Sequence, residues 1–140
     1  MKKLNSLVIA AVLASMAAVA HAEVVVVVSS KSSVAELTKD QVADIFLGKA
    51  ATFPQGGQAV PIDLAPGAPN RDEFYTKTTG RSAAQLKSYW AKQSFSGKGT
   101  APKAVAGDDE VKKLIAANPN TISYIDKARV DASVKVVFTP

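Results

Sequence analysis

The 140-residue sequence predicts an α/β fold, because apolar runs typical of strands alternate with capped segments typical of helices. The clearest strand signal is EVVVVV at 23–28, since five successive valines leave no polar face and indicate a strand covered on both sides. The helix signals are pairs in which Ser or Thr lies three residues before Gln, the capping-box spacing. The predicted order of elements is β-α-β-α-α-α-β-β.

Residues 1–22, MKKLNSLVIAAVLASMAAVAHA, have the layout of a secretory signal peptide: a basic start, an apolar run from Leu7 to Ala20 and an A-x-A ending at Ala22. The alternative is a membrane anchor, but the apolar run is shorter than the ~20 residues that a spanning helix needs. We therefore expect cleavage after Ala22, export to the periplasm without stable membrane insertion, and a single domain at 23–140.

Composition excludes most enzyme classes. The one histidine, His21, lies in the predicted leader, and the chain has no cysteine. The exported part therefore lacks the residues for an ordinary zinc, copper or haem site, a Ser-His-Asp triad or a thiol nucleophile. We expect no enzyme activity, no metal and no cofactor. The formal charge of +5 falls when Lys2 and Lys3 are removed, and a mild basic excess favours small anions and argues against nucleic acid.

The first helix is predicted after Thr38, which forms a capping box with Gln41, and it ends at Gly48. AVPIDL at 59–64 indicates a second strand, in which Pro61 favours a sheet edge or an irregular start.

A helix is then predicted from Asn70 to about Gly80, and another begins at a second capping box, Ser82 with Gln85. On that helix Leu86, Tyr89 and Trp90 share the predicted buried side. GDDEVKKLIAANP indicates a last helix that stops at Asn118-Pro119, and TISYI and VKVVF indicate two closing strands.

The segment SFSGKGT at 94–100 places Lys98 between two glycines, as in a loop that binds an anion through backbone N–H groups. The nucleotide-binding pattern G-x-x-x-x-G-K-[ST] is absent, because Lys92 occupies the first glycine position and Gly99 follows the lysine. The pair Gly48-Lys49 fails the same test. Nucleotide hydrolysis is excluded, and anion binding remains open.

Two segments carry a resemblance to a known family: L-T-x-x-Q-x-x-x-I-F-x-G-K at 37–49 and N-P-x-x-I-x-Y at 118–124. Together with RDEFY and YWAKQSFSGKGTAPK, they make the chain similar to the periplasmic phosphate-binding proteins of ABC transporters, and more so to their small, single-unit relatives. The resemblance implies a three-layer fold, one lobe of a type II periplasmic-binding-protein-like fold with a central mixed sheet flanked by helices. It also implies binding of phosphate or a similar oxyanion, with a transporter permease or an outer-membrane channel as partner.

The expected ligand loop departs from the family pattern. In the large members the strand that matches 59–64 leads to a Ser-Gly-Thr turn at a helix start, which holds the phosphate. The matching stretch here is APGAPNR, with Ala68 near the position of an oxygen donor, although Asn70 could cap the helix instead. Arg71 is interpreted as a forked anion ligand or as a solvated residue paired with Glu73 or Asp72. The resemblance therefore implies weak anion affinity.

Further candidate ligands lie in two polar loops. Ser29, Ser30 and Ser32 can hydrogen-bond an anion or form an ordinary turn, and Lys98 can contact an anion or be part of an exposed loop. We predict that an oxyanion lies between 66–71 and one of the two loops, 29–33 or 94–100. Tyr124 is expected in the core with its hydroxyl paired, and Asp63 near the surface at a strand end.

A second function remains open: an interaction or assembly module of the periplasm that has kept the lobe and lost the ligand. Separately, we expect weak pairing of the chain with itself or with another exported protein, strengthened by an anion that bridges the two surfaces. An enzyme is not favoured, because no coherent nucleophile and base are visible in the sequence.

Overall fold

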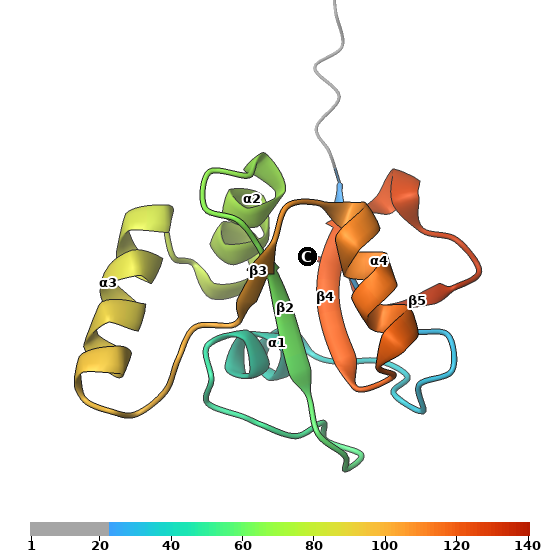
Figure 1. Cartoon of the computed structure of the whole chain (residues 1–140), viewed down its shortest axis with the longest axis horizontal. Coiled ribbons are helices and arrows are strands. Elements are labelled where there is room, and N and C mark those ends of the chain that lie inside the picture. The colour runs from blue at the N-terminus through green and yellow to red at the C-terminus, as the bar shows by residue number, and fades with distance from the viewer. Residues whose placement is uncertain (1–22) are drawn as a thin grey trace, which may run out of the picture.

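In this computed structural model, residues 23–140 are described, and the predicted signal peptide lies outside them. They form three layers, with a mixed five-stranded sheet between helices, as predicted (Figure 1). The elements are β1 (Val24–Ser29), α1 (Lys39–Phe46), β2 (Val60–Leu64), α2 (Pro69–Thr79), α3 (Ala83–Phe95), β3 (Lys103–Val105), α4 (Asp108–Ala117), β4 (Thr121–Asp126), the short 3-10 helix η1 (Lys127–Arg129) and β5 (Val134–Phe138).

The strand order is β3-β2-β4-β1-β5. Strands β2, β3 and β4 are parallel to one another, whereas β1 is antiparallel to both β4 and β5. All six residues of β1 are buried, which confirms the interior strand predicted from the valine run. Because β1 is antiparallel to β4 and β2 is parallel to it, the carboxyl end of β1 and the carboxyl end of β2 lie at opposite ends of the sheet's strands.

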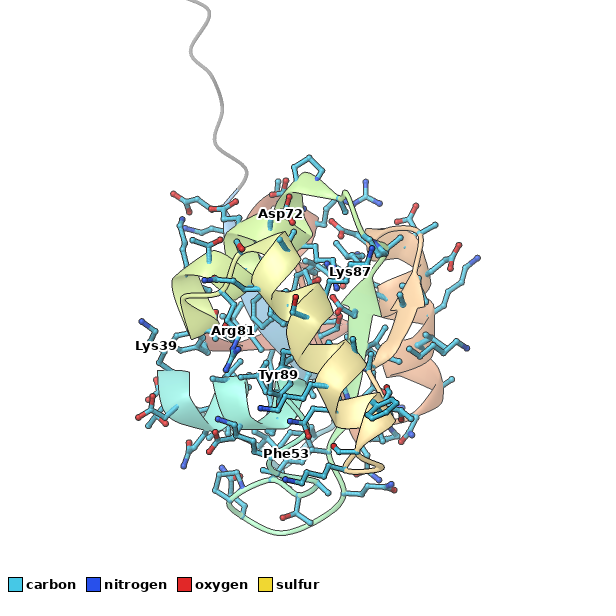
Figure 2. All side chains as sticks on the ribbon, turned by 90° about the vertical axis from the view of Figure 1, so that its left-hand side faces the viewer. Lys39, Phe53, Asp72, Arg81, Lys87 and Tyr89 are labelled. Atoms are coloured by element: carbon cyan, nitrogen blue, oxygen red, sulfur yellow. The ribbon has the colours of Figure 1, made fainter. Side chains whose placement is uncertain are left out.

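The helices cover the sheet unequally. Helices α1 and α2 pack against each other and α2 packs on one sheet face, while α4 packs on β4 and β1 (Figure 1). Helix α3 lies farther out, and Figure 2 looks directly onto it. It buries Leu86 and Trp90, and its Tyr89 hydroxyl donates a hydrogen bond to the Leu47 carbonyl at 2.6 Å.

An aromatic cluster fixes α1 and α2 on the sheet. The Phe74 ring stacks on Tyr124 at 4.1 Å between centroids and meets Phe46 edge-on at 4.8 Å. Tyr75 completes the cluster at 5.0 Å from Phe74. All four side chains are almost fully buried, so the cluster joins two helices to β4 through close-packed apolar contact.

Both predicted capping boxes are present. The Thr38 hydroxyl accepts from the Gln41 backbone N–H, and the Thr38 backbone N–H donates to the Gln41 side chain. Ser82 and Gln85 form the same two bonds. Gly80 ends α2 in the left-handed conformation with φ of 69°. These local signals placed the helix boundaries correctly because each involves residues no more than three or four positions apart.

Strand β3 was not predicted, so the true order contains one more strand, between α3 and α4. It has three residues at the edge of the sheet, two of them exposed, which is too short to produce a periodic pattern. Pro61 was expected at an edge or at an irregular start. The edge is wrong for the strand as a whole, because β2 lies between β3 and β4. Pro61 pairs with Ile122 of β4, and the ladder with β3 begins one residue later, at Ile62, so the missing N–H of the proline costs no bond to β3.

Among residues 23–140 there is no helix with the length and apolar character needed to cross a membrane. The buried apolar core is built from residues between Val24 and Val137.

Gly48 is tightly placed at the end of α1, and its replacement should report on that contact. Its φ is +73°, and a Cβ added there would lie 3.1 Å from Cη2 of Trp90. We expect Gly48→Ala to lower the free energy of unfolding by about 1–2 kcal/mol from backbone strain alone, and further through Trp90, as measured by urea denaturation. Gly80→Ala is the matched control, since its φ of +69° is similar and nothing lies within 4 Å of its added Cβ. Equal losses in the two variants would contradict the role of Trp90.

Candidate functional site

The candidate site lies at the edge of the sheet where β2, β3 and β4 end. Because these strands are parallel, the segments that follow them meet at one edge, where α2, α4 and η1 begin (Figure 1). This is the edge at which open α/β sheets usually bind ligands.

An open groove of about 740 Å³ occupies this edge, and we call it the carboxyl-end groove. Its floor is largely apolar, and its rim carries four carboxylates and one guanidinium. The lining residues are Leu64, Ala68, Pro69, Asn70, Ala106, Gly107, Asp108, Asp109, Glu110, Asp126 and Arg129.

Two helix starts face the groove. Helix α2 is preceded by Ala68 and α4 by Gly107, and neither N-cap residue makes a side-chain cap bond. The sequence left Asn70 open as the N-cap, but the N-cap residue is Ala68, and Asn70 is the second residue of α2. The amino end of a helix carries free N–H groups and partial positive charge, so these starts attract an anion.

The carboxylates oppose that attraction. Asp108, Asp109 and Glu110 form the first turn of α4, and Asp126 lies at the end of β4. Asp108 accepts from the backbone N–H of Asp126 at 3.2 Å, and Asp109 pairs with Arg129. A groove with more carboxylates than cations repels an oxyanion at long range, so any anion bound here is held against the local field. Residues 23–140 contain no His, Cys, Asp or Glu cluster that could hold a metal ion.

Arg71 lies in the first turn of α2 and forms an ion pair with a buried carboxylate of β2. Its Nε is 3.5 Å from Oδ2 of Asp63, and its guanidinium lies over the Tyr75 ring at 5.3 Å. The expected pairing with Glu73 or Asp72 is wrong, because Glu73 binds Lys77 and Asp63 holds the arginine. The reason is that position 71 lies on the inner side of α2, which the residue spacing did not reveal.

Asp63 was expected near the surface, and this is wrong, because it is 3% exposed. Its carboxylate accepts hydrogen bonds from the Tyr75 hydroxyl at 2.7 Å, from the Tyr124 hydroxyl and from the Leu64 backbone at 2.8 Å. Burial, with the Asp63 charge as the second cause, raises the pKa of Tyr75 and of Tyr124 far above the ordinary tyrosine range. Both hydroxyls therefore remain protonated donors, as predicted for Tyr124.

The serine loop lies at the other edge of the sheet. Ser29 ends β1, which is antiparallel to β4, so Ser29, Ser30 and Ser32 lie roughly a strand length, about 17–20 Å, from the start of α2. The side-chain hydrogen bonds of Ser29 and Ser32 are local: the Ser29 hydroxyl accepts from the backbone N–H of Lys31, and the Ser32 hydroxyl accepts from that of Val34. These bonds are those of an ordinary polar turn.

Lys98 is also separate from the groove. Its loop joins α3 to the beginning of β3, whereas the groove follows the end of β3. Of the predicted ligands, the fold brings together Asn70 and Arg71 and separates both from Lys98 and from the three serines. A site between residues 66–71 and either polar loop is therefore not assembled within this chain. Sequence reasoning missed the acidic rim, because it interpreted GDDEVKKLIAANP only as a helix and assigned no role to its acidic start.

Comparison with known proteins found no matching family model and no matching curated protein. Solved structures match at the level of the fold. A putative phosphate ABC transporter substrate-binding protein with bound phosphate from Clostridium perfringens is 25% identical, with a TM-score of 0.66 over 82% of this chain and 44% of its own.

Two further structures agree. An ABC-type phosphate transport receptor from Vibrio cholerae is 18% identical, with a TM-score of 0.63 over 82% of this chain and 45% of its own. A possible phosphate binding protein from Planctomyces limnophilus is 12% identical, with a TM-score of 0.61 over 82% of this chain and 40% of its own. The chain therefore spans less than half the length of the structures that it matches.

Proposed function

We propose that this chain, a single-lobe structural relative of the phosphate ABC transporter substrate-binding proteins, binds phosphate or a similar oxyanion weakly at the start of α2. The observation that carries the proposal is the position of Arg71. Its Nε lies 3.5 Å from the Asp63 carboxylate, an ion pair without a hydrogen bond, in the first turn of a helix without a side-chain cap. The solved relatives are named as binding or receptor proteins, which supports a binding role in place of catalysis.

Three contributions favour an anion at this point: the helix dipole, the backbone N–H of Asn70 and the arginine. Two oppose it. The adjoining groove is open to solvent, and four carboxylates line it. Solvent weakens charge-assisted bonds, so we propose a millimolar dissociation constant, or about −4 kcal/mol.

Titration of phosphate into the protein, followed by amide NMR shifts, tests the proposal. We expect shifts at Asn70 and Arg71, and binding about tenfold or more weaker in Arg71→Lys, which keeps the charge and loses the fork. Asn70→Ala is a second variant that leaves the buried carboxylate in its contacts.

The control is Lys98→Ala, which removes a cation at the other end of β3 and should leave the titration unchanged. A second groove, of about 770 Å³ beside α3, contains Arg81 and Lys92. Phosphate shifts confined to those two residues, or to the serine loop, would overturn the proposed site.

A second candidate function is an interaction module, and the acidic rim of the carboxyl-end groove favours it. In either role we propose export to the periplasm and cleavage after Ala22, supported by the leader-like residues 1–22. We also propose a transporter or channel component as partner, supported by the printed names of the solved relatives.

A further inference from the structure

The far end of α3 carries an unusual surface. Phe95, its last residue, is 98% exposed, whereas every other phenylalanine in the described part is buried or packed against the core. Lys92 lies one turn before it and Lys98 three residues after it, and both are exposed. We call these three residues the α3 tip. The whole apolar surface of this ring is available to be buried against a partner.

The charge of this region is one-sided along the sequence. Between Glu73 and Asp108 the chain contains six lysines and arginines and no acidic residue. The α3 tip therefore lies in a basic region, and it suits a partner surface that combines an apolar floor with carboxylates.

The carboxyl-end groove has this complementary chemistry. Leu64, Ala68, Pro69 and Ala106 supply apolar floor, and the first turn of α4 supplies carboxylates. A groove of about 740 Å³ is large enough to accept a phenylalanine ring. The α3 tip of the same chain is at the other end of β3, so the two surfaces meet between copies of the chain (Figure 1).

We propose that the α3 tip of one copy docks into the carboxyl-end groove of a second copy. Phe95 lies on the apolar floor, while Lys92 and Lys98 face the carboxylates. The contact is heterologous, so the two end copies of an assembly keep a free tip and a free groove, and short chains of copies form as concentration rises. The surfaces are small, so association is weak, and it depends on salt because the charges are exposed. This pairing does not depend on oxyanion binding.

Sedimentation velocity of the chain from Glu23, over a range of concentrations, tests the pairing. We expect association in ~0.01 M salt that is lost in ~1 M salt, where the Debye length falls from about 30 Å to about 3 Å. Phe95→Ser should weaken association about tenfold or more, as expected for an aromatic anchor. A protein that is monomeric in low salt at all concentrations, or a Phe95→Ser variant that associates normally, would overturn the proposal.

Charge reversal gives a sharper test. The variant Lys92→Glu/Lys98→Glu has an acidic tip and an acidic groove, and Asp109→Lys/Glu110→Lys has a basic tip and a basic groove. Each variant alone should stay monomeric, because its tip and groove carry the same charge. An equal mixture should associate, because the tip of each variant is then complementary in charge to the groove of the other. Lys31→Glu/Lys87→Glu is the matched control, with the same change in charge away from the tip (Figure 2 labels Lys87).

Failure of the mixture to associate would overturn the tip-to-groove contact, as would association of either variant alone. Loss of pairing in Phe95→Ser without any effect of charge reversal would indicate ring-to-ring contact and overturn the groove. Phosphate titration of the monomeric Phe95→Ser variant tests oxyanion binding separately, so the two proposals fail independently.

Discussion

Replacing Asp63 with alanine should lower the free energy of unfolding by about 3–5 kcal/mol, the cost of breaking a buried charge pair from one side. The carboxylate is 3% exposed and accepts from two tyrosine hydroxyls and from the Leu64 backbone. Its loss leaves those donors buried without partners and leaves Arg71 without its anion. Urea denaturation followed by circular dichroism measures the change.

Asp72→Ala is the matched control for that substitution. Asp72 is an exposed carboxylate next to Arg71 in the first turn of α2, and its removal should cost about 0.3–1 kcal/mol through the helix dipole. If Asp63→Ala does not fold, Tyr75→Phe and Tyr124→Phe each remove one donor to a charged group and should each cost about 1.5–3 kcal/mol. Similar stabilities for Asp63→Ala and Asp72→Ala would show that the buried network contributes little.

Phe74→Ala should destabilise the protein by about 3–5 kcal/mol, as expected when a fully buried phenylalanine is truncated. The ring is 0% exposed and contacts Phe46, Tyr75 and Tyr124. Truncation removes apolar contacts from both helices and from β4 and leaves a cavity that the close-packed neighbours cannot fill. The midpoint of urea denaturation should fall accordingly.

The chain offers a control with the same chemical change. Phe95→Ala also truncates a phenylalanine on a helix, but its ring is 98% exposed, so the free energy of unfolding should change by less than about 0.5 kcal/mol. A loss in Phe74→Ala as small as that in Phe95→Ala would contradict the aromatic cluster as the link between the helices and the sheet.

Features whose causes are local could be predicted from the sequence. Both capping boxes, the end of α2 at Gly80 and the buried valine strand depend on residues within a few positions of one another. The α/β class follows from the alternation of such elements. Strand β3 could not be predicted because its three residues carry no pattern and become a strand by pairing with β2.

The candidate site depended on longer-range relations. Asp63 looked like a surface carboxylate because its hydrogen-bond partners Tyr75 and Tyr124 lie 12 and 61 residues away. Arg71 resembled a solvated first-turn residue for the same reason. The sequence contains these side chains, but they come into contact only because α2 packs on β2 and β4.

The sequence by itself determined the class of fold, most helix boundaries, the interior position of β1 and a resemblance to phosphate-binding proteins. The tertiary structure decided which polar residues meet. Strand direction is set by pairing between distant segments, and because β1 is antiparallel to β4, the serine loop lies at one edge of the sheet and Arg71 at the other. Local patterns in a chain carry no information on that direction, because a strand has the same residues and the same period whichever way its neighbour runs.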